Sequence, residues 1–363
     1  MDRSNDRSSH DGVIPKGGGI GILAAFLFAS WVLGLPLLFL ISIGLTALVS
    51  FYGDRKEIPA KIRLCVQFIA GVALLAGIFH WEGRGWPVYL LIPFFAVFVV
   101  GTANYYNFMD GIDGIAGITG IVAFGLIALF GVLSGANEPL VILAGCMGFG
   151  CLGFLPFNMP RARVFMGDVG SILLGFVFAS MVVWLSKSLL DFLCLSAFML
   201  PFYADELTTL VVRVKDGGRK WEDEGLKCGM DAPVKCATLS HSEFHGVKMN
   251  RVAGLMGMLM KPHRRHLYQL LANERGIDHW KVSVGYGVFQ LIVGVSVMVV
   301  RPVGIWGVVA VLAAWFGGFV GVSFYFRRKL ATDYRLMSRA PVRSSGPTPV
   351  EHPEGSGSTG QAG

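Results

Sequence analysis

Apolar residues occur in long uninterrupted stretches along most of the chain, separated by short polar segments. A helix of roughly 20 apolar residues spans the hydrocarbon core of a bilayer. The pattern therefore predicts an all-α fold, a polytopic membrane helix bundle with about ten transmembrane helices. The predicted spans are Ile20 to Leu33, Pro36 to Tyr52, Ile62 to Phe79, Val88 to Tyr106, Ile115 to Leu133, Pro139 to Phe157, Ile172 to Leu185, Leu190 to Val211, Val282 to Val300 and Val303 to Phe326.

The composition supports this prediction, and the positions of the basic residues account for the net charge. Of the 363 residues, 53% are hydrophobic and 15% are charged, with a mean hydropathy of +0.59, which excludes a soluble globular domain and a disordered chain. If the N-terminus lies in the cytoplasm, the outer loops contain only Arg84, Lys187 and Arg301 of the 31 Lys and Arg residues. The charge of +7 therefore reflects basic cytoplasmic loops, so we expect contact with membrane lipid and no nucleic acid.

The membrane region is flanked by two polar segments and interrupted by a third. Residues 1–19 are expected to form a Gly-rich cytoplasmic segment that lacks the apolar core of a signal peptide, and residues 20–337 the membrane domain. Residues 338–363 are rich in Ser, Gly and Pro and are expected to be disordered, and a cytoplasmic insert lies at 216–260. The spacing of its Cys and His residues is not a standard zinc arrangement and favours a variable loop. These residues are Cys228, Cys236, His241 and His245.

Polar residues gather in five clusters, and the predicted topology places all of them on the cytoplasmic side. The clusters are Asn5 to Gly19, Gly53 to Arg63, Asn104 to Gly117, Asn158 to Ser171 and His263 to Gln269. Asp110 and Asp113 lie three residues apart in the third cluster, at a membrane boundary, and Asp168 follows a glycine in the fourth. We expect these clusters to form one composite site.

The residue types in the clusters suit phosphoryl transfer. Carboxylates supply the hard oxygen ligands that Mg²⁺ prefers, and nearby Arg and His neutralise the remaining phosphate charge. Each cluster alone has another interpretation: Asp110 and Asp113 are typical of helix caps, the basic run from His263 is typical of a lipid headgroup contact, and Lys16 of a flexible lead. Two acidic clusters on one side of the membrane favour the metal and phosphate interpretation.

Five motifs follow one another between about Asn5 and Phe326. They are Asn5 to His10 with Pro15 to Gly19, Asp54-Arg55, Asn107 to Gly114, Phe165 to Ser171 and His263 to Gln269. In this order they resemble the polyprenyl-phosphate N-acetylhexosamine-1-phosphate transferases of glycosyltransferase family 4. The form of the last motif is similar to that of the branch that initiates O-antigen and other surface polysaccharides.

The resemblance implies a reaction at the cytoplasmic face of the bacterial inner membrane. The phosphate of undecaprenyl phosphate would attack the β-phosphorus of a UDP-N-acetylhexosamine of the GlcNAc, QuiNAc or FucNAc type, and UMP would leave. The family pattern assigns Mg²⁺, with Mn²⁺ as its substitute, to Asp168 and Asp54, and adds Asp110 and Asp113 to the catalytic residues. The substrate-binding residues that it implies are Lys16, Arg63, Asn107, Phe165, His263, Arg264 and His266.

Several features depart from the family pattern. Gly53 stands where the family has the first of two adjacent aspartates, and the insert is longer than expected. The family has a helix before the first motif, so we expect the true start of the protein to lie upstream. Asp205 and Glu206 also resemble a family position, although acidic residues at a helix end near lipid headgroups are an alternative. A catalytically impaired relative, a membrane transporter and a CDP-alcohol phosphotransferase are the rival interpretations, and a homodimer is left open.

Overall fold

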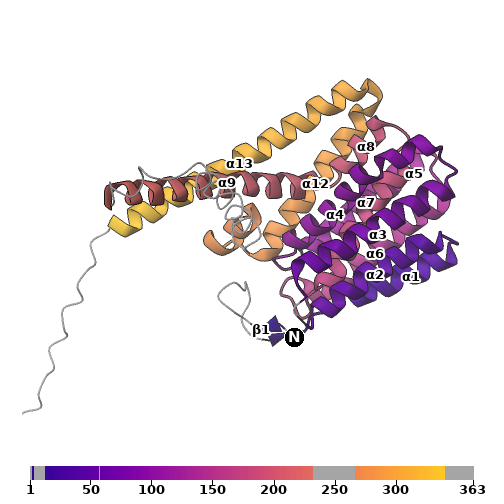
Figure 1. Ribbon diagram of the computed structural model, residues 1–363, viewed down its shortest axis with the longest axis horizontal. Coiled ribbons are helices and arrows are strands. Elements are labelled where there is room, and N and C mark those ends of the chain that lie inside the picture. Colours follow the sequence, from indigo (N-terminus) through magenta and orange to yellow (C-terminus); the bar gives the residue numbers. More distant parts are fainter. Residues whose placement is uncertain (1, 4–12, 57, 232–265, 340–363) are drawn as a thin grey trace, which may run out of the picture.

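The computed structural model describes residues 2–3, 13–56, 58–231 and 266–339, which are almost entirely helical (Figure 1). The long helices are α1 (Gly19–Val32), α2 (Leu37–Gly53), α3 (Ala60–Trp81), α4 (Ile92–Met109), α5 (Ile115–Ser134), α6 (Glu138–Asn158), α7 (Asp168–Leu185), α8 (Leu189–Ala197), α9 (Leu200–Asp231), α12 (His279–Val300) and α13 (Ile305–Arg339). Short helical turns are η1 (Trp86–Leu91), α11 (Leu267–Gln269), η2 (Leu270–Glu274) and η3 (Arg301–Val303). Two short strands, β1 (Asp2–Arg3) and β2 (Val13–Ile14), pair antiparallel. The all-α prediction is confirmed.

Seven helices of the described chain are long and apolar enough to cross a membrane. They comprise α3, η1 with α4, α5, α6, α7, α12 with η3, and the first part of α13. The bent pair of α8 and α9 is an eighth candidate, and α1 and α2 are apolar but shorter. Each predicted apolar stretch therefore contains helix, and the chain is a multi-pass membrane protein.

Helix α7 occupies the centre of the bundle, where α1, α2, α4 and α5 pack against it. Every residue of α7 from Val169 to its end is buried. A Cβ atom on Gly175 would lie 2.7 Å from the Cα of Ala103, so the absence of a side chain lets α4 and α7 approach closely. Because α7 begins at Asp168, the most deeply packed helix of the bundle presents this carboxylate.

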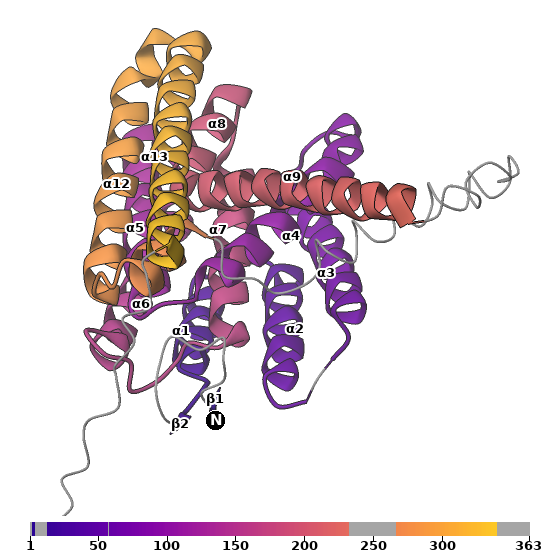
Figure 2. The ribbon, with the colours of Figure 1, turned by 90° about the vertical axis from the view of Figure 1, so that its left-hand side faces the viewer.

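The predicted span from Leu190 to Val211 is not one straight helix, because the chain breaks between α8 and α9 and turns by 81°. Figure 2 shows α9 running across the direction of the bundle helices. Pro201 is the second residue of α9, where the missing N–H of proline removes no helical hydrogen bond. The described backbone of α9 continues to Asp231, so the first part of the predicted insert is helical. The rest of the insert and the tail beyond residue 339 lie outside the described residues.

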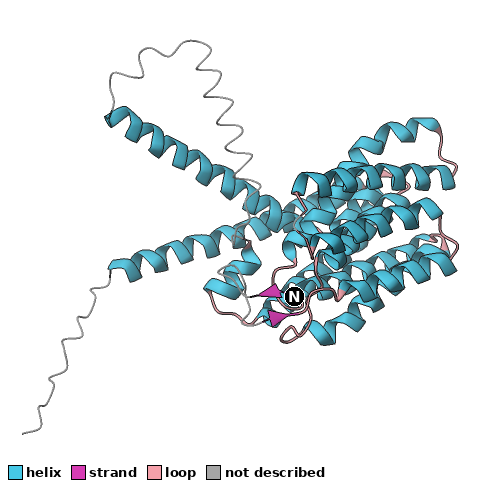
Figure 3. Ribbon diagram, turned by 60° about the horizontal axis from the view of Figure 1, so that its bottom comes forward, coloured by secondary structure: helices cyan, strands magenta, loops and turns pink. Residues whose placement is uncertain are grey.

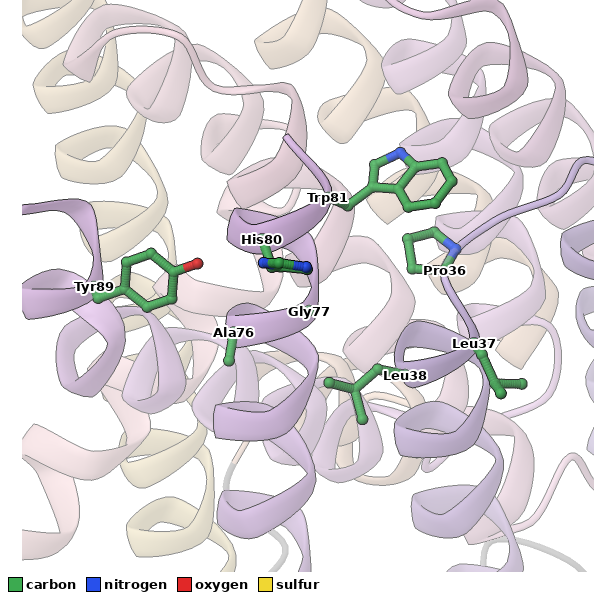
Figure 4. A pocket seen from close by; sticks show the side chains of 8 residues that line it. All are labelled: Pro36, Leu37, Leu38, Ala76, Gly77, His80, Trp81 and Tyr89. Carbon is green, nitrogen blue, oxygen red and sulfur yellow. The ribbon is translucent and has the colours of Figure 1, made fainter. Parts of the chain in front are cut away.

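The two ends of the bundle carry different groups. At one end, the Arg301 guanidinium lies 2.8 Å from the Asp191 carboxylate, and Trp184 donates a hydrogen bond to Glu82 at 2.8 Å. A pocket of about 460 Å³ at this end lies between α2 and α3 (Figure 4). It is lined by Pro36, Leu37, Leu38, Ala76, Gly77, His80, Trp81 and Tyr89. The other end contains the starts of α3, α7 and α12 and the ends of α2, α4 and α6. We call it the carboxylate end, and Figure 3 shows the two strands beside it.

Candidate active site

Both carboxylate oxygens of Asp168 contact side chains of neighbouring helices at the carboxylate end. The Arg63 guanidinium of α3 lies 2.6 Å from its Oδ2, and the Asn107 amide of α4 donates to its Oδ1 at 3.0 Å. Asn107 also donates to the Ser171 hydroxyl at 2.9 Å, one turn further along α7. Charge-assisted contacts of this kind fix a carboxylate more firmly than neutral hydrogen bonds do. The structure thus brings predicted site residues from α3, α4 and α7 into direct contact.

Asp54 lies against the start of α7. Its carboxylate oxygens accept the N–H groups of Asp168 and Val169 at 3.3 and 3.4 Å. The first N–H groups of a helix have no partner within the helix and favour a nearby negative charge. Burial nevertheless raises the pKa of Asp54 above its ordinary value, and repulsion from Asp168 raises it further. Gly167 permits this approach, because its φ is +75° and a Cβ there would lie 2.8 Å from Asp54 Oδ2.

Residues 15–19, which we call the N-terminal strap, are joined to the loop before α7 by backbone hydrogen bonds. The N–H groups of residues 17–19 donate to the carbonyl oxygens of Phe165 and Met166 at 3.0–3.1 Å. These N–H groups are therefore already hydrogen-bonded within the protein. The strap does pair Lys16 with Phe165 in the backbone, so these two predicted substrate-binding residues are neighbours.

The turn between α4 and α5 is held by residues that the sequence did not single out. Asp113 accepts the N–H of Ala162 at 3.2 Å, and its carboxylate lies 3.4 Å from Nδ1 of His279. Asn158 accepts the N–H of Gly114 at 2.7 Å. Asn158 is the first residue of the fourth polar cluster, and this position was its only mark in the sequence. The histidine begins α12, and only its position at a span boundary marked it in the sequence.

Asp110 directly follows the last residue of α4, and its pKa is raised. Burial raises its pKa to about 7, and the negative charges of Asp168, Asp54 and Asp113 contribute to the increase. The positive charge of Lys16 opposes it. Among the described residues, no hydrogen-bond donor reaches the Asp110 carboxylate. A group with this environment is stabilised by any cation that binds beside it.

A divalent cation fits this arrangement of carboxylates. In the part of the chain that the structure describes, no three His, Cys, Asp or Glu side chains are arranged to hold a metal ion by themselves. Mg²⁺ is commonly bound through one or two carboxylates, several waters and the phosphates of a substrate, and needs no such set. The mutual repulsion of the four aspartates is what a bound cation would relieve. The residues therefore fit Mg²⁺ held jointly with a phosphate-containing substrate.

A cleft of about 840 Å³ opens beside Asp113. Its lining residues are Ile14, Asp113, Pro156, Met159, Pro160, Arg161, Ala162, Arg163, Asp278, His279 and Trp280. The volume falls within the range of roughly 300–1,000 Å³ that is typical of small-molecule sites. Arginine, aspartate, histidine and tryptophan side chains meet in this cleft, whereas the pocket of Figure 4 is lined mainly by apolar groups. The cleft at the carboxylate end is therefore the better candidate for a charged substrate.

The last polar cluster is only partly described. His263 and Arg264 lie outside the described residues, and His266 directly precedes α11. The His266 side chain is buried, with Nε2 3.5 Å from Glu206 and Nδ1 3.9 Å from Asp205. The imidazole thus contacts two carboxylates of α9, and its role in phosphate binding stays a prediction. Side chains that also lie outside the described part are those of Cys228, Cys236, His241 and His245.

The fold and the carboxylate end together define a polytopic membrane protein with its polar site at one end of a helix bundle. Residues 36–186 match the family model described as Glycosyl transferase family 4. The resemblance indicated by the ordered motifs is therefore confirmed. The matched region contains Asp54, Arg63, Asn107, Asp110, Asp113, Phe165 and Asp168.

Curated relatives agree with the family match. A Yersinia pestis protein named undecaprenyl-phosphate alpha-N-acetylglucosaminyl 1-phosphate transferase is 31% identical over 195 residues, which cover 48% of this chain and 53% of the relative. The protein of the same name from Thermotoga maritima is 31% identical over 182 residues, with coverages of 48% and 53%. That from Salmonella typhi is 33% identical over 205 residues, with coverages of 51% and 54%. The chain spans about half the length of the curated relatives it matches.

Proposed function

We propose that the chain transfers HexNAc-1-phosphate from a UDP-N-acetylhexosamine to undecaprenyl phosphate and releases UMP. The observation that carries this proposal is the contact of Asp168 with Arg63 and Asn107 at the start of a buried helix. These residues lie in the region that matches Glycosyl transferase family 4. Relatives of this chain are named undecaprenyl-phosphate alpha-N-acetylglucosaminyl 1-phosphate transferase, which supports the choice of the acceptor and of the transferred group.

Phosphoryl transfer depends mainly on positioning and charge neutralisation, and different residues of the carboxylate end would supply each. Asp168 and Asp54 would hold Mg²⁺, which when bound neutralises the diphosphate of the donor. Arg63 and Asn107 keep the Asp168 carboxylate in one orientation, since each contacts a different oxygen. Asp110 lies beside these groups at the end of α4. Further substrate contacts are assigned to Lys16, Phe165, His263, Arg264 and His266.

We also propose that the carboxylate end faces the cytoplasm of the bacterial inner membrane. Support comes from the basic residues, because the opposite end contains Arg84, Lys187 and Arg301, and the predicted topology assigns the remaining 28 of the 31 Lys and Arg to the other side. Mg²⁺-dependent transfer at this face, to a lipid carrier, suits the first step of O-antigen or other surface-polysaccharide synthesis.

A transporter is the alternative to the transferase, because broken helices such as the pair α8 and α9 also occur in transporters. Transporter sites lie near the middle of the bilayer. Here Asp54, Asp110, Asp113 and Asp168 lie at helix ends, and the family match covers all of them. Both observations favour the transferase.

The test is an assay of membranes that contain the full chain. UMP release and lipid-linked sugar are measured from undecaprenyl phosphate and UDP-GlcNAc, and then from other UDP-N-acetylhexosamines, with Mg²⁺ or EDTA. Product that needs the metal and is lost in Asp168→Asn is expected. A folded protein that yields no product from any of these donors would contradict the proposal and favour a catalytically impaired relative.

A matched control separates loss of chemistry from loss of structure. Asp191 pairs with Arg301 at 2.8 Å, much as Asp168 pairs with Arg63, but at the opposite end of the bundle. Asp191→Asn is expected to lower the melting temperature and to leave the activity of the folded protein intact. Equal loss of activity in both variants would mean that Asp168 has only a structural role.

A further inference from the structure

Asp205 lies near the start of α9 with no exposed surface, and its carboxylate accepts four hydrogen bonds. Its Oδ1 accepts the backbone N–H of Leu267 at 2.8 Å and the Thr209 hydroxyl at 3.4 Å. Its Oδ2 accepts the Tyr286 hydroxyl at 2.8 Å and the backbone N–H of Tyr268 at 3.4 Å. The two backbone groups open α11, where the helix itself supplies no acceptor for them. Asp205 therefore fixes α11 against α9 and α12.

The Tyr268 side chain connects this network to the candidate active site. It is fully buried, and its hydroxyl donates to the carbonyl oxygen of Phe108 at 3.0 Å. A Cβ on Gly111 would lie 2.2 Å from the same hydroxyl oxygen, so the turn after α4 packs directly on the tyrosine. Phe108 lies two residues before Asp110 and Gly111 directly follows it, and Asn107 precedes Phe108. Tyr268 therefore packs against the end of α4 and the turn that contains Asp110.

We propose that Asp205 is a positioning residue for the proposed transferase. It fixes Tyr268, and Tyr268 fixes the end of α4 that carries Asn107 and Asp110. This inference rests on the proposed function and adds a residue outside the region that matches the family model, which ends at residue 186. Because a displacement of about 1 Å at a reacting centre lowers rates by about a hundredfold, a link of this kind acts on turnover.

Asp205→Asn is the sharpest perturbation, because it keeps the shape and replaces one acceptor oxygen by an amide donor. The hydroxyls of Thr209 and Tyr286 can rotate and accept a hydrogen bond from that amide, but a backbone N–H only donates. Whichever way the amide turns, either Leu267 or Tyr268 is left with an N–H that faces another donor. The substitution therefore disturbs α11 itself and does not merely remove a charge.

The experiment measures kcat and KM of the purified full chain, with undecaprenyl phosphate and a UDP-N-acetylhexosamine that the wild type turns over. Asp205→Asn and Tyr268→Phe are each expected to lower kcat by about tenfold or more, with KM for the nucleotide sugar changed by less than about threefold. The kcat of the double variant is expected to be little lower than that of the less active single variant, because both substitutions act through the same contacts. Tyr203→Phe is the control, since the Tyr203 hydroxyl lies 2.9 Å from the Thr102 hydroxyl and also joins α9 to α4, but away from Asp110.

Three results would overturn the inference or separate it from the proposed function. If Asp205→Asn and Tyr268→Phe lower the melting temperature but have the same kcat as the control Tyr203→Phe, Asp205 has only a structural role. If the effects of the two substitutions multiply in the double variant, they act independently and the path is wrong. If the wild type makes no product, the proposed function fails, and the Mg²⁺-induced rise in melting temperature decides the inference. Asp205→Asn should then reduce that rise relative to Tyr203→Phe, and an equal rise would refute the positioning role.

Discussion

Replacing Gly19 by alanine tests whether the N-terminal strap holds the candidate active site in place. A Cβ at this position would lie 2.3 Å from the Cα of Gly170 and 2.4 Å from its backbone nitrogen. Both are backbone atoms, so no change of rotamer relieves the contact. Gly170 lies in the first turn of α7, two residues after Asp168. The added methyl group must therefore move the strap or the start of α7.

The size of the effect follows from these distances. Non-bonded carbon atoms rest at about 3.5–4.0 Å, so the strap and α7 must separate by about 1 Å or more. Overpacking of this kind costs about 1–3 kcal/mol, and each of the backbone hydrogen bonds donated by residues 17–19 is worth about 0.5–1.5 kcal/mol. Detachment of the whole strap would relieve the overpacking but lose these three hydrogen bonds, which would lower the free energy of unfolding by about 1.5–4.5 kcal/mol. We expect kcat to fall by about ten- to a hundredfold, because Asp168 moves with the first turn of α7.

Gly21→Ala is the matched control, two residues further along α1. Among the described residues, no atom lies within 4 Å of a Cβ built there, apart from its chain neighbours and the backbone of its own helix. Alanine favours a helix over glycine by up to about 1 kcal/mol, so this variant should melt at the same or a higher temperature. The assay compares melting temperature in detergent and lipid-linked product per folded protein. Equal behaviour of the two variants in both measurements would refute the role of the strap.

Two further predictions concern the carboxylates. Gly53→Asp has room for its side chain, because a Cβ there would lie 3.6 Å from Arg63 Cδ. The new carboxylate adds a hard oxygen ligand, so the Mg²⁺ concentration that half-saturates product formation should fall by about tenfold. Gly53→Asn adds the same bulk without the charge, and an unchanged Mg²⁺ dependence of Gly53→Asp would contradict the reasoning. Burial raises the pKa of Asp110 from 3.8 to about 7, so between these values the folded protein binds more protons than the unfolded chain, and stability should fall as pH rises. Melting temperatures from pH 4 to 8 should fall less steeply in Asp110→Asn, and identical slopes would show that Asp110 does not titrate in this way.

The apolar pattern predicted the spans because a helix in a bilayer must satisfy its own backbone, so length and composition decide its formation. The same pattern did not predict the break within the segment from Leu190 to Val211. Both halves of this segment are apolar, and only Pro201 marked the break. After the bend, the Asp205 carboxylate accepts hydrogen bonds from the backbone of the distant residues Leu267 and Tyr268. Contacts over this sequence distance leave no periodic pattern in the sequence.

The candidate site shows the same division. The sequence predicted that Arg63, Asn107 and Asp168 share one side of the membrane, and the structure brings them into contact. It did not predict the strap, because hydrogen bonds between backbone groups of residues 17–19 and Phe165 depend on no side chain. The glycines of residues 17–19 were the visible signal in the sequence.

The way in which the four aspartates are held explains where a cation should matter most. Asp54 is held by the first N–H groups of α7, Asp168 by an arginine and an amide, and Asp113 by a backbone N–H. Asp110 has no such donor among the described residues, and its pKa is raised to about 7 by burial and by the charges of the other three. A divalent cation held by Asp168 and Asp54 would therefore also relieve the repulsion that these two carboxylates exert on Asp110. Because this relief does not involve position 53, a glycine there is compatible with a working metal site, and we expect the wild type to bind Mg²⁺ without the family's additional carboxylate.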